Sequence, residues 1–125
     1  MLKIIYVGLG GFFGASCRYL LTKWAEMKWE TLFPNGTLLV NILGSFLLGA
    51  LMILFVEKTT GYSNAKLLIK TGFLGAFTTF STFSYETIML LENKNLLTAG
   101  INIISNLFLA LIAAFIGILT AKNLF

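Results

Sequence analysis

Histidine and aspartate are absent from this 125-residue sequence, and cysteine and proline each occur once. A single cysteine cannot form a disulfide within the chain, and a chain without histidine lacks the commonest zinc ligand and proton-transfer group. These absences argue against a disulfide scaffold, a zinc protein and most acid–base enzymes, so we do not expect an enzyme. Cys17 lies in a hydrophobic run, where we interpret it as a small buried packing residue.

Charge is also scarce. Charged residues make up 11% of the chain and hydrophobic residues 58%, whereas soluble domains carry about 25% charged residues. So few polar groups cannot cover the surface of a soluble domain. A membrane-spanning helix needs about 20 mostly apolar residues, so four spans use about 80 residues and leave short connections. We therefore place the chain in lipid, with no separate soluble domain.

Four hydrophobic segments alternate with charged stretches and predict spans at about residues 4–21, 36–56, 67–91 and 96–121. Within lipid, only helices and closed barrels satisfy their own backbone groups, and barrel strands would be shorter and alternating. Gly10 and Gly14, in the first span, have the four-residue spacing of closely packed membrane helices. The sequence predicts an all-α membrane protein, a single four-helix transmembrane domain over residues 1–125.

The positive charges give little indication of orientation. An even number of spans puts both termini on one side of the membrane, which then carries Lys3, Lys58, Lys66, Lys70 and Lys122. The other side carries Lys23, Lys28 and Lys94, with Arg18 at the end of the first span. This weak bias favours cytoplasmic termini but also permits insertion in both orientations, so that inverted copies could pair. There is no clustered basic stripe, so nucleic acid is not an expected partner.

Polar side chains repeat at helical spacing within two of the spans. The second span carries polar or small residues every four positions, at Thr37, Asn41, Ser45 and Gly49. The fourth span carries Asn102 and Asn106. An asparagine in hydrocarbon is costly unless its amide finds partners, so these faces meet protein, water or a ligand. Two interpretations remain open: interhelical hydrogen bonds, or amide donors for something that crosses.

The third span is the most unusual of the four. Between Lys70 and Glu86 lie six serine and threonine residues, Thr71, Thr78, Thr79, Ser81, Thr82 and Ser84. The same stretch holds Phe73, Phe77, Phe80 and Phe83. In a regular helix these rings would share a sector of about 120°, a packing stripe that the periodicity alone favours. The hydroxyl density instead is typical of a span whose backbone bonds are interrupted.

Charge is missing at the middle of every span, because Arg18 and Glu86 both lie near span ends. Proton-coupled transporters usually need an intramembrane ionisable group. A small proton-coupled exporter of organic cations would need a carboxylate in the first span, which holds none. Neutral amides, hydroxyls and phenyl edges suit an anion, so the residues point to a passive anion pathway. A structural subunit without transport is a third possibility.

Three segments resemble the Fluc (CrcB-type) family of fluoride channels. They are GGFFGA at 10–15 followed by Arg18, GTLLVN at 36–41 followed by GSF at 44–46, and GFLGAFTTFSTFS at 72–84 followed by Glu86. The resemblance covers nearly the whole chain, and the third string is the most specific. It implies a third helix interrupted near its middle and an antiparallel, dual-topology homodimer. The dimer would export cytoplasmic fluoride passively through two pores in the cell (plasma) membrane.

The resemblance also implies roles for individual residues. Phe80 and Phe83 match the family's phenylalanine box, and Asn41 matches its pore-lining amide. The remaining predicted pathway residues are Thr37, Ser81, Thr82, Ser84, Asn102 and Asn106. Arg18 and Glu86 are vestibule or structural charges, and a structural Na⁺ at the dimer interface would be bound by the backbone carbonyls of Gly75 and Thr78. The chain departs from the family pattern at Ala110 and Ala114, where further hydroxyls would continue the polar track of the fourth span.

Overall fold

The computed structural model describes residues 1–58 and 63–124, and every regular element within these ranges is helical. The three long helices are α1 (Leu2–Lys28), α2 (Asn35–Lys58) and α6 (Leu96–Leu124). Between α2 and α6 lie α3 (Asn64–Lys66), η1 (Leu67–Leu74), α4 (Gly75–Phe77) and α5 (Phe80–Glu92). The all-α prediction is confirmed. Residues 59–62 and 125 of the predicted single domain lie outside the described residues.

Three of the helices are long and apolar enough to cross a membrane: α1, α2 over Asn35–Phe55, and α6. The third predicted span is built from shorter pieces, with η1 and α4 before a break and α5 after it. At the break, Thr78 (φ −81°, ψ 155°) and Thr79 (φ −150°, ψ 115°) are extended. The interruption is confirmed, and the continuous packing stripe is wrong for this span.

The chain before the break is wound more loosely than an α-helix. Residues 67–74 form a π-helix, and the Gly75 N–H bonds to the Lys70 carbonyl five residues earlier. Such segments are rare and often lie next to functional sites. The π-helix is therefore separated from the interruption only by the short helix α4.

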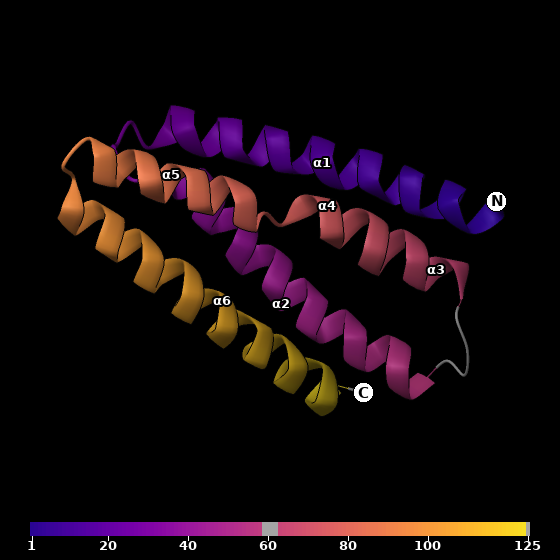
Figure 1. Cartoon of the computed structure of the whole chain (residues 1–125). Coiled ribbons are helices and arrows are strands. Elements are labelled where there is room, and N and C mark those ends of the chain that lie inside the picture. Colours follow the sequence, from indigo (N-terminus) through magenta and orange to yellow (C-terminus); the bar gives the residue numbers. More distant parts are fainter. Residues whose placement is uncertain (59–62, 125) are drawn as a thin grey trace.

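The helices pack in two main pairs (Figure 1): α1 lies along η1 and α4, whereas α2 lies along α6. The N-terminus and the C-terminal end of α6 lie toward the same end of the bundle, as an even number of spans requires. At the opposite end, Lys94 adopts a left-handed conformation (φ 59°) in the tight turn between α5 and α6. This arrangement surrounds the break with α1 on one side and α2 with α6 on the other.

Glycines set the contact between α1 and η1. A Cβ atom at Gly10 would overlap the Leu68 carbonyl oxygen, and one at Gly14 would overlap the Phe73 carbonyl oxygen. These residues let two backbones touch, so the close packing predicted from the Gly10 and Gly14 spacing is confirmed. The first half of the third span is therefore held against α1 by backbone contact.

Much of the surface is apolar. Large side chains such as Phe12, Phe80, Phe108 and Phe115 are each more than half exposed, as expected of a protein surrounded by lipid or by a second copy. Cys17 is also exposed. Its prediction as a buried packing residue is wrong: Cys17 shares the helix face of Gly10 and Gly14, but α1 packs on η1 and α4 before the break and makes little contact with α5 beyond it.

Candidate ion pathway

The break in the third span is held open by one side chain of α2. The Thr79 N–H donates to Asn41 Oδ1 at 2.9 Å, and Asn41 Nδ2 donates to the Thr79 carbonyl at 3.1 Å. Asn41 thus pairs with both backbone polar groups of an extended residue. Exposed backbone groups in the hydrocarbon region must be satisfied by the protein. The costly asparagine therefore has a structural partner, which is the interrupted backbone itself.

This pairing changes which carbonyls remain free. In a continuous α-helix, the N–H of Thr79 would bond to Gly75 and the N–H of Thr82 would bond to Thr78. The Thr79 N–H donates to Asn41 instead, and the Thr82 N–H donates to the Thr79 hydroxyl at 3.1 Å. The carbonyls of Gly75 and Thr78 thus lose their usual helical donors. Free carbonyls at a helix break are typical cation ligands.

The deep amides form a connected series across two helices, α2 and α6. Asn41 Nδ2 also donates to Asn106 Oδ1 at 2.9 Å, and Asn106 Nδ2 donates to Asn102 Oδ1 at 2.9 Å. Asn102 is fully buried and Asn106 is 5% exposed. The interhelical hydrogen bonds that the sequence left open are therefore present. The assignment of Asn102 and Asn106 to the ion pathway stays a prediction.

Two phenylalanines of α5 and two of the deep amides meet at one cavity. It has a volume of about 270 Å³, and its lining includes Asn41, Asn106, Phe80, Phe83 and Thr78. The two rings lie 5.3 Å apart, tilted at 59°. Phe83 is 7% exposed, whereas Phe80 is 72% exposed. The structure thus brings together at the break residues that lie up to 65 positions apart in the chain.

A second cavity, of about 300 Å³, opens on the α1 side of the break. Its lining includes Arg18, Lys23 and Glu26 from α1 together with Thr37, Thr79 and Thr82. The predicted residues Arg18, Thr37 and Thr82 therefore share a space, and Thr79 joins it to the break. Two basic groups and one acidic group make this cavity the more positively charged of the two.

The hydroxyls of α5 divide into two groups. Thr79 Oγ1 caps the helix, donates to Thr82 Oγ1 at 3.0 Å and lies 3.3 Å from Ser81 Oγ. Ser84 instead donates to the Phe80 carbonyl of its own helix at 2.9 Å. The first group surrounds the N-terminus of α5, where the helix dipole places partial positive charge. An anion is therefore favoured at this end of α5, beside the break.

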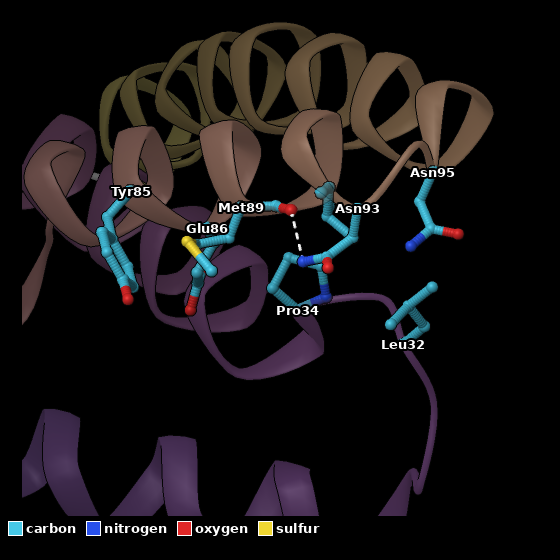
Figure 2. Close-up of a pocket in the computed structure, with 8 residues that line it drawn as sticks. Leu32, Pro34, Tyr85, Glu86, Met89, Asn93 and Asn95 are labelled. Atoms are coloured by element: carbon cyan, nitrogen blue, oxygen red, sulfur yellow. Dashed lines mark hydrogen bonds between the residues drawn. The ribbon is translucent and has the colours of Figure 1, made fainter.

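Glu86 is bonded through one oxygen only. Thr37 Oγ1 donates to Glu86 Oε1 at 2.8 Å, whereas Oε2 is buried with no hydrogen-bond partner among the described residues. Figure 2 shows Glu86 and Tyr85 extending from α5 on the side where Pro34 lies. They line a cavity of about 570 Å³ near the α5–α6 turn. Glu86 thus contacts the predicted pathway residue Thr37 and also lines the cavity near the α5–α6 turn.

Two residues with structural roles were missing from the predicted site. Thr79 caps α5 and pairs with Asn41, and Thr87 bonds to the Phe83 carbonyl at 2.7 Å. A threonine before a helical run is a common N-cap, so the position of Thr79 held a usable signal. Thr87 held none, because its importance depends on a partner from α6.

Comparison with known proteins then identifies the family. The family model described as "CrcB-like protein, Camphor Resistance (CrcB)" matches residues 5–118. The chain belongs to the CrcB family. A CrcB-family chain with three helices long enough to cross the membrane and a fourth, interrupted span is a multi-pass membrane protein. The resemblance seen in the sequence is confirmed.

Individual CrcB relatives match over almost their whole length. The "Fluoride-specific ion channel FluC" of Clostridium perfringens is 48% identical over 126 residues, covering 100% of this chain and 98% of the relative. "Fluoride-specific ion channel FluC 1" of Methanosarcina acetivorans is 42% identical, covering 99% and 94%. The "Fluoride-specific ion channel FluC" of Methanococcus maripaludis is 47% identical, covering 94% and 93%.

Proposed function

We propose that this protein is a fluoride-selective channel, and not an enzyme, which lets cytoplasmic fluoride leave the cell passively across the plasma membrane. The observation that carries the proposal is the cavity at the helix break, where Asn41, Phe80 and Phe83 meet. The names of the full-length relatives support the choice of ion. The hydrophobic run of the first span, residues 4–21, contains no carboxylate, which a proton-coupled cation exporter would need.

The chemistry follows from neutral groups. Phenyl ring edges carry the positive end of the aromatic quadrupole, and hydroxyls and amides donate hydrogen bonds. Both Asn41 donor contacts are to protein oxygens, those of Thr79 and Asn106. A fluoride ion arriving at the break would take over one of these donors, while Phe80 and Phe83 present ring edges. The ion exchanges water for these groups without meeting a full positive charge.

A second copy completes the pathway. A single four-helix bundle fills its centre with side chains, and Phe80, 72% exposed, extends out of the chain that carries it. An antiparallel homodimer would place Phe80 of each copy against the other and create two equivalent pathways. The weak charge bias permits both orientations that such a dimer requires.

Sodium would then hold the two breaks together. The carbonyls of Gly75 and Thr78 have lost their helical donors, and Gly75 is exposed on this chain. Four such oxygens, two from each copy, provide the hard ligands that small cations prefer. Sodium bound there supplies structural charge at the interface, while the chain's own residues line the anion pathway.

One end of the pathway carries charges of both signs. Arg18 and Lys23 at the α1-side cavity raise the local concentration of anions. Ser81, Thr82 and the α5 N-terminus guide the ion toward Asn41, and Ser84, Thr37 and Asn106 continue the polar route, with Asn102 bonded behind Asn106. Glu86 is bonded to Thr37, which lines the same cavity as Arg18, so its carboxylate limits how strongly this vestibule holds the anion.

The test is ion efflux from liposomes that contain the purified protein. We expect rapid fluoride loss and little chloride loss, recorded with ion-selective electrodes. Phe80→Ile or Phe83→Ile should abolish the fluoride efflux. The matched control is Phe115→Ile, because Phe115 is exposed and lies on the side of α6 opposite Asn106. Equal fluoride and chloride rates, or proton flux driven by an organic cation, would contradict the proposal.

A further inference from the structure

The buried polar side chains form a circuit that begins at Thr79, the N-cap of α5, and ends on α5 itself. Its donors all run in one direction: Thr79 N–H to Asn41, Asn41 to Asn106, Asn106 to Asn102, Asn102 to Thr87, and Thr87 to the Phe83 carbonyl. The two ends of the circuit, Thr79 and Phe83, are four residues apart. Hydrogen bonds aligned in this way polarise one another. The circuit therefore ties the first turn of α5 to both α2 and α6.

The last two side chains that donate in this circuit, those of Asn102 and Thr87, lie behind the cavity. Asn102 is fully buried and Thr87 is 6% exposed, and neither is among the residues that line the cavity at Phe83. Asn102 Nδ2 donates to Thr87 Oγ1 at 2.9 Å, and this bond joins α6 to α5. The hydroxyl then donates to the Phe83 carbonyl at 2.7 Å. Thr87 and Asn102 touch the pathway only through Phe83 and Asn106.

Thr120 makes the same local hydrogen bond as Thr87 but without a partner from another helix among the described residues, and so provides a comparison. Thr120 donates to the Ile116 carbonyl of its own helix at 2.8 Å, the same four-residue geometry as Thr87. That bond is exposed, whereas the Thr87 bond is buried and its oxygen also accepts from a different helix. Leaving one member of a buried polar network unpaired costs more than losing an exposed local bond.

We infer that Thr87 and Asn102 are positioning residues, which hold the turn of α5 that carries Phe83 against α6 and so fix its ring beside Asn41. This inference rests on the proposed channel function, because it assigns these residues a role in conduction. α5 packs on α6 much less extensively than α2 does. A directed hydrogen bond thus sets the placement of Phe83 where apolar packing is thin.

The experiment compares fluoride efflux per mole of monodisperse protein in liposomes. Thr87→Val and Asn102→Leu should each reduce the efflux at least about tenfold, because each leaves a buried polar partner unpaired. Thr87→Ser keeps the hydroxyl and should stay within about twofold of the unchanged protein. The double variant should lose no more than the worse single variant, since both changes remove the same bond. Thr120→Val is the matched control and should conduct normally.

Hydrogen exchange of the backbone provides a second readout. Asn102→Leu should speed amide exchange over residues 79–84 while leaving α1 unchanged, whereas Thr120→Val should leave residues 79–84 unchanged. Normal efflux in Thr87→Val, or a loss in Thr87→Ser as large as in Thr87→Val, would overturn the inference. If the unchanged protein passes no fluoride, the proposed function fails. Exchange over residues 79–84 then decides the positioning role alone, and an unaltered rate in Asn102→Leu overturns it.

Discussion

The two halves of the third span are held against the neighbouring helices by different interactions. Before the break, η1 rests against α1 through Gly10 and Gly14, where backbone meets backbone. After the break, α5 is tied to α2 and α6 by side-chain hydrogen bonds, from Asn41 to Thr79 and from Asn102 to Thr87. The first half depends on an absence of side-chain volume. The second half depends on individual hydrogen bonds made by side chains of different helices.

The aromatic pairs show the same contrast. Phe73 and Phe77, before the break, stack almost parallel, with centroids 5.7 Å apart and an angle of 11°. Phe80 and Phe83, after the break, are tilted at 59° beside a cavity. Packing therefore dominates the first half, whereas the second half keeps space for an ion. We expect the two halves to respond oppositely to changes of volume and of polarity.

The largest expected effect comes from adding volume to the first half. Gly10→Val would drive side-chain atoms into the Leu68 carbonyl, and we expect a loss of about 3 kcal/mol or more, since backbone cannot move aside. The measurement is the thermal unfolding midpoint and the yield of monodisperse protein. Gly8→Val is the matched control, because a Cβ at Gly8 has no atom within 4 Å. Equal midpoints for both variants would contradict the packing account.

Removing polarity from the second half should abolish transport before it abolishes folding. Asn41→Ala leaves the Thr79 N–H without its acceptor, and the Thr79 carbonyl and Asn106 Oδ1 without their donor. We expect fluoride efflux to fall about tenfold to a hundredfold, since unpaired buried groups are costly. Asn93→Ala is the control, because the exposed Asn93 amide donates only locally, to the Met89 carbonyl (Figure 2). Normal efflux in Asn41→Ala would show that the helix break keeps its geometry without the hydrogen bonds from Asn41.

The junction between the halves should respond to sodium. If Gly75 and Thr78 bind the ion, raising sodium to about 100 times its dissociation constant stabilises the folded state by about 2.7 kcal/mol. Thermal unfolding at constant ionic strength measures this, with N-methylglucamine replacing sodium. An unfolding midpoint that stays the same when sodium is replaced would contradict the sodium site, but it would not contradict the helix break.

The smallest effect is expected from a change of shape in the first half. Phe73→Leu keeps an apolar side chain of similar size, so we expect a cost below about 1.5 kcal/mol and fluoride efflux within about twofold of normal. Phe83→Leu is the matching change in the second half and should stop efflux. Equal losses in the two variants would remove the distinction between a packing pair and a pathway pair.

Sequence patterns predicted the helical fold because hydropathy and backbone satisfaction in lipid leave few alternatives. The interruption was also predicted, although phenylalanine spacing alone favours a continuous helix; hydroxyl density and resemblance indicated the break. The π-helical turn of η1 and the exposure of Cys17 were not predicted. The first depends on how η1 packs against α1, and the second on the small contact between α1 and α5 beyond the break; single-chain periodicity reveals neither.

The candidate site was predicted by residue type more completely than by contact. Asn41, Phe80 and Phe83 do meet at one cavity, but the sequence left open whether Asn41 bonds to protein. Its partner, Thr79, lies 38 positions away. Thr87 escaped notice because a threonine on a helix ordinarily bonds to its own backbone. Only a neighbouring helix turns that local bond into part of a network.

The amino-acid order alone determined that this chain enters a membrane, how many times it crosses, and which span is too polar to remain a regular helix. Tertiary structure decided which amide clamps the break, which carbonyls lose their donors and which hydroxyl supports Phe83. The reason is physical: burial in lipid acts on each segment separately, whereas a directed hydrogen bond exists only when two segments arrive with donor facing acceptor.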